Sequence, residues 1–318
     1  MRRAAPRASR LVGGGLDAVI LGAQTSMRDV RATGGLPTCD TIACRDIMPQ
    51  APREEPVSSL LDFTRMIEER MTASGCPLWY RGCGKSSHEL KPTLFRHPDN
   101  KDTEKLIALE SDILARFKER SVPYQERPLA NDWEYLFLMQ HFRVPTRLLD
   151  WTENPYIALY FAATSSPFLV KGGKLEFEGD AALWILEPVP WNRRALQHIG
   201  FKGGILSSSS EFLKSYQPAQ DYEYLNSEPV ALYGIHNNPR IVAQRGVFTI
   251  FGKNSSPMET IYREHDFPAD CLIKLVLPKN SLPNLLASVV SIGYADSVVF
   301  PDLEGLAKEI RRFFGFWV

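Results

Sequence analysis

Residues 140–162 read QHFRVPTRLLDWTENPYIALYFA and carry the clearest fold signal in the chain. A polar turn precedes an apolar run at Thr146–Thr152 that predicts a strand. Asn154-Pro155 then begins a helix, because asparagine caps helix N-termini and proline is favoured at the first helical position. The stretch therefore predicts a strand held between two helices.

Helices dominate before this stretch, and strands dominate after it. Apolar residues at helical spacing predict helices from Leu60 to Met71, from Thr103 to Glu119 and from Asn131, where Asn131 and Glu134 fit a capping box. Predicted strands are Leu78–Arg81, Ala181–Leu186, Arg240–Phe251, Cys271–Leu277 and Ser297–Phe300, and the chain closes with a helix whose apolar face is Leu303, Leu306, Ile310 and Phe313. Because strands and helices do not alternate regularly, the pattern predicts an α+β fold.

The N-terminal residues differ from the rest of the chain. Residues 1–56 lack periodicity and are rich in Gly, Arg, Ala and Thr, which predicts a disordered tail and linker before one domain at 57–318. A basic start followed by the partly apolar stretch Leu11–Ala23 resembles a signal peptide, but Gly13–Gly15 and Asp17 interrupt it. We therefore expect a cytoplasmic protein.

Composition limits the possible partners. Lys and Arg number 37, as do Asp and Glu, so the formal net charge is zero and any anionic partner must be met by a local cluster of cations. The five cysteines match no zinc-site spacing, and no apolar stretch reaches the length of a membrane span. We expect neither a metal site nor membrane association.

Tyr80-Arg81-Gly82 with Lys85 downstream forms the first candidate binding segment. An arginine at the end of a strand can direct its planar guanidinium toward phosphate or ribose oxygens. The alternative is an ordinary surface arginine. A phosphate-binding loop at Gly82–Ser86 is excluded, since Trp79 occupies the position of its first glycine.

The central stretch supplies the second candidate segment. Arg147 and Asp150 can pair, Trp151 offers a stacking face, and the helix beginning after Asn154 presents N–H groups to an anion. The alternative is a structural corner in which Asp150 caps, Arg147 pairs and Trp151 packs. A third segment, Pro239–Thr249, places Gln244 on a predicted strand before a glycine turn.

Four motifs in order carry a family resemblance. WYRG, then QHFRVPTRLLDWTENPYIALYFA, then PRIVAQRGVFTIFG and FPDLEGLAKEI resemble the FRG domain, a mostly bacterial family named for a Phe/Tyr-Arg-Gly motif. Tyr80-Arg81-Gly82 carries that motif here, and the match runs from Trp79 to Ile310.

The same order resembles, at a greater distance, the ADP-ribosyltransferase folds. That resemblance implies helices packed around a split, mostly antiparallel β-sheet whose central cleft holds NAD as a substrate, with Arg81, Thr152 and Gln244 at catalytic positions. The candidate ligand-binding residues are Tyr80, Gly82, Lys85, His141, Arg147, Asp150, Trp151 and Asn154. Gln244 cannot supply the negative charge of the usual glutamate, so Asp150, Glu153 and Glu304 are candidates for that charge.

Three functions fit these observations. The first is an NAD-dependent ADP-ribosyltransferase-like enzyme that modifies a protein or nucleic acid. The second is a non-catalytic module that binds a nucleotide or RNA. The glutamine at position 244 favours this function over that of a highly active enzyme. The third is a structural or interaction domain.

Overall fold

The computed structural model describes residues 51–125, 127–235 and 239–316. Residues 1–50 of the predicted tail therefore lie outside the described residues. Arg53–Pro56, which we assigned to the tail, forms strand β1 and pairs in parallel with strand β9 (Leu272–Leu277). Lys274 also binds Glu54 at 2.7 Å. The folded region thus begins before Val57, and the predicted boundary is a few residues too late.

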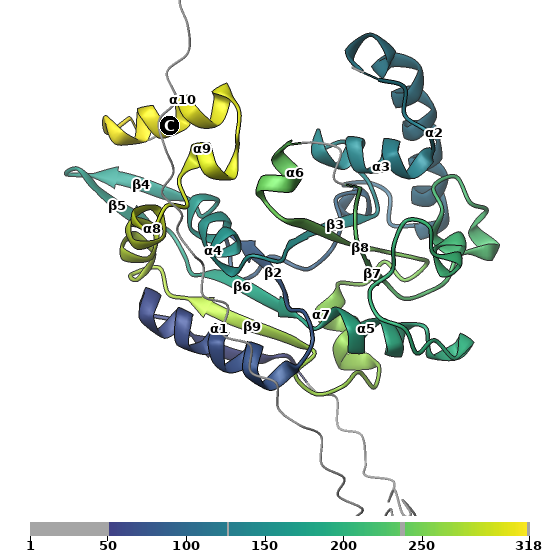
Figure 1. Ribbon diagram of the computed structural model, residues 1–318, viewed down its shortest axis with the longest axis horizontal. Helices are drawn as coiled ribbons and strands as arrows, with labels where there is room; N and C mark the ends of the chain where they lie inside the picture. Colours follow the sequence, from purple (N-terminus) through teal and green to yellow (C-terminus); the bar gives the residue numbers. More distant parts are fainter. Residues whose placement is uncertain (1–50, 126, 236–238, 317–318) are drawn as a thin grey trace, which may run out of the picture. The chain divides into compact units, whose positions relative to one another are not determined.

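A seven-stranded sheet forms the centre of the fold (Figure 1). Only the pair β1–β9 is parallel, and all other neighbouring strands are antiparallel. The strands lie in the order β1, β9, β6 (Ala181–Leu186), β2 (Trp79–Cys83), β3 (Leu148–Thr152), β8 (Gly246–Ile250) and β7 (Val230–Leu232). A separate hairpin consists of β4 (Phe168–Lys171) and β5 (Lys174–Phe177). The expectation of a mostly antiparallel α+β fold is confirmed.

The sheet is divided in the middle. Strand β2 pairs with β6 along its whole length, and β3 does the same with β8. Between β2 and β3, however, only Tyr80 and Thr152 are partners. The two halves of the sheet therefore meet at one residue pair and separate beyond it.

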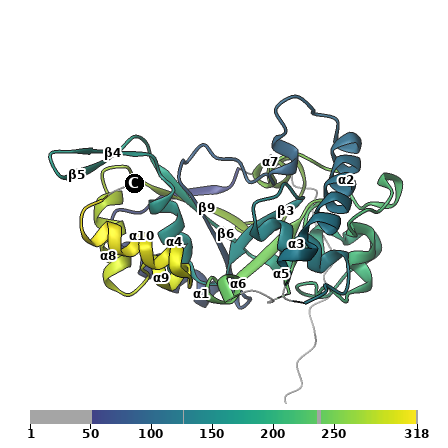
Figure 2. The same cartoon turned by 90° about the horizontal axis from the view of Figure 1, so that it is seen from above.

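Helices cover both halves of the sheet (Figures 1 and 2). The helices α1, α4 and α8 contribute to one core of buried apolar side chains, while α3 and α5 contribute to a second core. Their bounds are α1 (Leu60–Ser74), α2 (Thr103–Ser121), α3 (Asp132–His141), α4 (Pro155–Thr164), α5 (Pro188–Ala195), α6 (Pro239–Ala243), α7 (Met258–Glu264), α8 (Leu282–Ser291), α9 (Asp296–Val299) and α10 (Leu303–Phe313). The caps predicted at Asn131 and Asn154 are confirmed, since both side chains accept hydrogen bonds from backbone N–H groups of the helix that follows.

Two predicted strands are wrong in part or whole. Pro239–Ala243 forms α6 and only Gly246–Ile250 forms a strand, because Arg245 turns the chain with a φ of 46°. The apolar run at Ser297–Phe300 belongs mainly to α9, a helix of four residues. A helix that short cannot display the 3.6-residue period that separates helices from strands. Among the described residues, no helix has the length and apolar character needed to cross a membrane.

Candidate functional site

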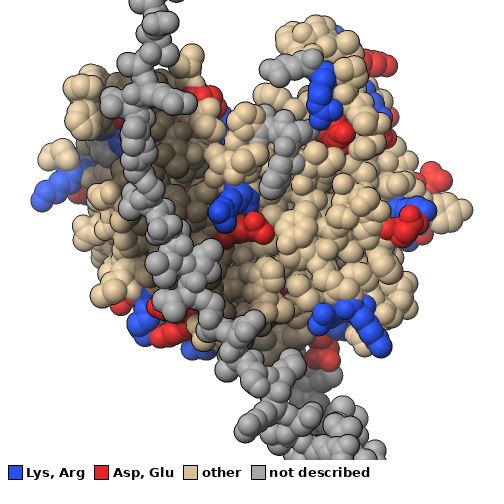
Figure 3. Space-filling view, in the orientation of Figure 1, with Lys and Arg blue, Asp and Glu red and all other residues tan. Residues whose placement is uncertain are grey.

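A cleft opens where β2 and β3 separate. Its cavity measures about 280 Å³, and its lining comes from β2, α3, β3, α4, α6, β8 and Phe300. In Figure 3 the described surface is hollowed near this region, where basic and acidic side chains lie next to one another. The lining joins segments that lie more than 200 residues apart in the chain, from Tyr80 to Phe300.

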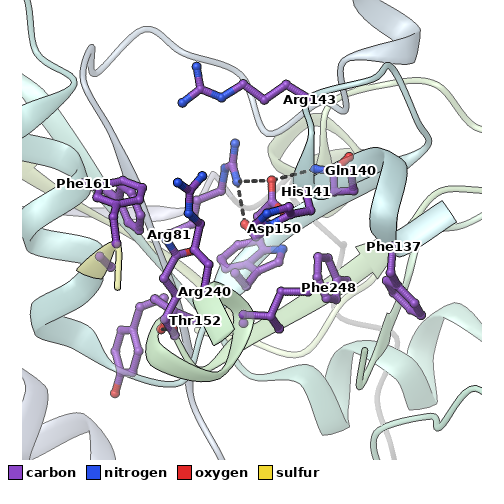
Figure 4. A pocket seen from close by; sticks show the side chains of 18 of the residues that line it. Arg81, Phe137, Gln140, His141, Arg143, Asp150, Thr152, Phe161, Arg240 and Phe248 are labelled. Atoms are coloured by element: carbon purple, nitrogen blue, oxygen red, sulfur yellow. Dashed lines mark hydrogen bonds and ion pairs between the residues drawn. The ribbon is translucent and has the colours of Figure 1, made fainter. Parts of the chain in front are cut away.

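Arg81 bridges the gap between the two halves of the sheet. Its Nη1 donates a 2.5 Å hydrogen bond to the main-chain oxygen of Asp150 and lies 3.9 Å from the Asp150 carboxylate. Gln140 Nε2 donates to the same carboxylate at 2.7 Å, while Gln140 Oε1 accepts from Thr146 at 2.5 Å. These bonds, drawn in part in Figure 4, fix the carboxylate of Asp150 between Arg81 and Gln140.

The Asp150 side chain opens into the cleft. It is 55% exposed and lines the cavity, whose walls limit its contact with bulk water. That enclosure raises the pKa of Asp150, an effect that Arg81 and the hydrogen bond from Gln140 oppose. Asp150 is thus a carboxyl group presented to whatever occupies the cleft.

Two further arginines and a histidine line the same cleft. Arg143 follows α3, and Arg240 lies in α6, where it binds Asp302 at 2.7 Å and stacks on Phe300. Burial and the nearby Arg240 lower the pKa of His141. Figure 4 shows the guanidinium groups of Arg81, Arg143 and Arg240 gathered around the opening. Positive charge is concentrated here in a chain whose net charge is zero.

Arg143 occupies an unusual backbone position. Its φ is 60°, and its N–H and that of Val144 bond back to the carbonyls of Gln140 and Met139. This is the position after a helix that glycine normally fills, because a side chain in the left-handed region costs about 1 kcal/mol or more. The chain therefore carries an arginine where the backbone conformation favours glycine.

Aromatic side chains form the apolar walls of the cleft. The phenylalanines are Phe137 from α3, Phe161 from α4, Phe248 from β8, and Phe300. Trp151 also borders the cavity, but it is buried and its indole N–H donates to Thr249. The combination of flat apolar walls and cationic groups suits a ligand with a planar ring and an anionic group.

A smaller groove adjoins the cleft. It measures about 250 Å³ and shares His141, Arg143, Arg240 and Phe300 with the cleft. Phe142 and two residues of α10, Glu304 and Lys308, complete its lining, and the two α10 residues bind one another at 2.8 Å. The basic region therefore continues from the cleft to the beginning of α10.

Gly82 borders the cleft for a structural reason. A Cβ there would lie 2.0 Å from the carbonyl oxygen of Ala158 and 2.5 Å from the amide nitrogen of Ala162. Gly84 meets the backbone of Ser165 in the same way. The glycine of the Tyr-Arg-Gly motif thus lets α4 pack directly against β2.

Thr152 and Gln244 line the cleft together with Arg81, and their polar groups are engaged by the backbone. The hydroxyl of Thr152 donates to the main-chain oxygen of Gln244 at 2.6 Å and accepts from the amide of Asn154. The Gln244 side chain donates to the carbonyl of Val299 at 3.1 Å. Through these bonds, Thr152 and Gln244 help to hold β3, α6 and α9 together.

The expectation for Arg147 needs correction. Its side chain is 1% exposed and binds Glu110 at 2.7 Å, with further bonds to the carbonyls of Phe251 and Tyr216. Side chains alternate across a strand, so Arg147 and Asp150, which are three residues apart, point to opposite faces, and Asp150 lines the cleft. Arg147 therefore follows the structural alternative given for residues 146–152, in which this arginine pairs within the protein.

The remaining candidates divide between the cleft and its surroundings. Tyr80 borders the cavity but is almost fully buried, and burial raises its pKa. Lys85 is exposed outside the lining. Asn154 also lies outside it, where it caps α4 and donates to Tyr294, so it already binds the N–H groups that we expected to attract an anion. Of the candidate carboxylates, Asp150 lines the cleft, Glu304 lines the smaller groove, and Glu153 lines neither.

Several cleft residues were absent from the candidates drawn from the sequence: Phe137, Gln140, Arg143, Phe161, Arg240, Phe248 and Phe300. Most of them lie within the motifs quoted from the sequence, and their place in those motifs was the sign that they could belong to the site. The positive φ of Arg143 and the helical conformation of Arg240 leave no trace in apolar periodicity. Across the described ranges, no three His, Cys, Asp or Glu side chains are grouped to hold a metal ion.

Comparison with protein families finds one match, to a segment in the first half of the described chain. Residues 77–167 match the FRG domain, so the chain contains an FRG domain. The match includes β2, α3, β3 and α4, and the cleft residues Arg81, Gln140, Arg143 and Asp150 lie within it. Comparison with curated proteins and with solved structures finds no match.

Proposed function

We propose that the cleft binds a nucleotide-like anionic ligand and that NAD is the first member of this class to test. The observation that carries the proposal is the convergence of Arg81, Arg143 and Arg240 from three separate elements on one cavity. Guanidinium groups pair with phosphate oxygens through two parallel hydrogen bonds. Arg81 lies beside Asp150 and Arg240 binds Asp302, and with Arg143 the lining of the cleft still carries more positive than negative charge, which favours an anionic ligand.

The dimensions support a ligand with two parts. A cavity of about 280 Å³ is too small for a whole dinucleotide, but the adjoining groove adds about 250 Å³. Arg143, Arg240 and His141 line both spaces, and Arg81 lines the cleft alone. In the proposed complex, a ring packs among the phenylalanines and the diphosphate lies between the arginines.

Calorimetric titration of the full chain with NAD, ADP and adenosine tests binding. NAD and ADP should bind and adenosine should bind far more weakly, since it lacks the phosphates. Arg240→Ala should weaken ADP binding by roughly 10- to 100-fold, the value of one or two charge-assisted hydrogen bonds. Arg65→Ala is the matched control, because Arg65 is an exposed arginine that pairs with Glu69 away from the cleft. Equal affinities for adenosine and ADP would contradict the proposal.

NAD cleavage is the second proposed function, and the position of Asp150 favours it. Breaking the bond between nicotinamide and ribose develops positive charge on the sugar, which a nearby carboxylate stabilises. Nicotinamide leaves with the bonding electrons, and water or a nucleophile of an acceptor replaces it and loses a proton. Asp150 presents the charge that Gln244 lacks.

Incubation with labelled NAD and a cell lysate separates this enzyme from a binding module. Nicotinamide release or label transfer supports cleavage, whereas saturable binding without turnover supports the binding module. Asp150→Asn should abolish turnover and retain NAD binding. Gln244→Glu should not raise turnover, because the new carboxylate would lose the bond to the carbonyl of Val299. A rise in turnover with Gln244→Glu would return the acid position to residue 244.

A further inference from the structure

Helix α10 presents a continuous apolar seam to solvent. Leu303, Leu306, Ile310 and Phe313 recur at intervals of three, four and three residues, and their exposed fractions are 83%, 43%, 50% and 83%. Phe314 and Phe316 extend the seam and are 69% and 65% exposed. A narrow seam at this spacing is the pattern with which one helix packs along another.

The helix cannot rotate to bury this seam in its own chain. Its other side packs on α9, which lies beside it in Figure 1, and on Phe300, over whose ring Lys308 lies. Glu309 accepts from the amide of Ser297 at 3.0 Å, and Arg312 binds Asp296 at 3.2 Å. Gly305 is buried, and a Cβ there would lie 2.0 Å from the carbonyl of Phe300. An amphipathic helix normally buries its apolar face, whereas α10 packs its polar side on its own chain.

The exposed seam has the area of a protein interface. The three phenylalanines leave about 400 Å² exposed, given roughly 200 Å² for each full side chain. With the leucines and isoleucine the seam exposes on the order of 700 Å², close to the roughly 800 Å² that each partner buries in a stable complex.

We propose that α10 pairs with α10 of a second copy of this chain in a two-fold arrangement. Each copy presents the same row of leucine, isoleucine and phenylalanine side chains, so a two-fold axis at the seam buries one row against the other. The exposed area of one seam is close to what each partner buries in a stable complex, as such a dimer requires.

The seam and the smaller groove lie on different sides of α10. Glu304 and Lys308 line the groove together with Arg143 and Arg240, whereas the seam residues do not border it. The dimer rests on the seam alone and does not depend on the proposed ligand.

Sedimentation velocity of the full chain across a concentration series tests the dimer. The parent should form dimers in the micromolar range, and Ile310→Glu should raise the dissociation constant by at least about 100-fold. Leu61→Glu is the matched control, since Leu61 is a 79% exposed leucine on α1 and its substitution should leave association unchanged. Circular dichroism of each variant verifies folding.

Three outcomes would overturn the proposal: a parent that stays monomeric at about 100 μM, association unchanged by Ile310→Glu, or a monomer whose seam binds anionic lipid vesicles instead.

Discussion

The guanidinium of Arg81 donates a hydrogen bond to the main-chain oxygen of Asp150 at the point where β2 and β3 separate. A side chain thus replaces the ladder bond that a continuous sheet would make there. The same contact brings the Asp150 carboxylate within 3.9 Å of the guanidinium. The opening of the sheet and the charges of the cleft therefore have one structural origin.

Replacing Arg143 by glycine should separate stability from binding. Glycine relieves the left-handed backbone at φ 60°, so Arg143→Gly should raise the free energy of unfolding by about 0.5–1 kcal/mol. The same change should weaken ADP binding, because it removes one cation from the cleft. Thermal melting and calorimetry measure the two effects.

Ala219→Gly is the control for Arg143→Gly. Ala219 is exposed, has a φ of 57° and lies outside the cleft lining. It should gain similar stability with unchanged ADP affinity. Loss of stability in Arg143→Gly would show that this arginine supports the fold, and its backbone position would then be no sign of a ligand.

Ligand binding should take up protons. Enclosure already raises the pKa of Asp150, and a phosphate placed beside it raises that pKa further, so affinity for ADP should increase as pH falls from neutral toward the pKa of Asp150. His141 acts in the same direction, since its lowered pKa leaves it neutral at pH 7 and an anion favours its charged form.

Calorimetry in buffers of different ionisation enthalpy counts the protons taken up. Asp150→Asn and His141→Gln should each remove part of the uptake. Because the folded pKa of Asp150 is raised, its ionisation costs stability as pH rises through that value, so Asp150→Asn should reduce the loss of stability between about pH 4 and the folded pKa. Binding enthalpies that do not depend on the buffer would contradict the prediction.

Arg147 should matter for stability and only indirectly for binding. Its ion pair with Glu110 is buried on both sides, so Arg147→Ala leaves an unpaired buried carboxylate and should cost about 3–5 kcal/mol in unfolding free energy. Denaturant unfolding measures this cost. Arg116→Ala, on the exposed part of α2, should cost far less. Similar unfolding free energies for the two variants would contradict the buried pair.

Gly82 should tolerate no side chain. Gly82→Ala forces a Cβ into the backbone of α4 and should destabilise the fold by about 1–3 kcal/mol or more. Gly179→Ala is the control, since nothing lies within 4 Å of its added Cβ. Thermal melting of both variants measures the difference. An unchanged melting temperature for Gly82→Ala would mean that α4 does not pack on β2 as described.

Local signals in the sequence predicted much of the fold. Asparagine caps at Asn131 and Asn154 and the apolar run at Ala181–Leu186 give helices and strands that the structure confirms. The short α6 and α9 were misassigned because four or five residues span little more than one helical turn, which is too short to show the 3.6-residue period of apolar side chains. The parallel strand β1 depends on pairing with β9 more than 200 residues away, which no local pattern reveals.

The site was only partly predictable for a related reason. Arg81 and Asp150 were found because charged residues stand out within apolar strands, and both line the cleft. Arg147 has the same signal but points to the opposite face, and a one-residue shift along a strand decides which face a side chain occupies. Arg143 and Arg240 come together only through the tertiary packing of α3 and α6.

Titration of the parent chain and of Arg81→Ala with ADP tests the nucleotide-binding cleft most directly. We predict saturable binding to the parent, weakened by roughly 10-fold or more in Arg81→Ala and unchanged in Arg65→Ala, with affinity that falls as salt is added. Circular dichroism must show that Arg81→Ala remains folded, since its guanidinium also joins β2 to β3. Absence of ADP binding to the parent, or equal affinities in the parent and a folded Arg81→Ala, would contradict the cleft as a site for a nucleotide-like anion.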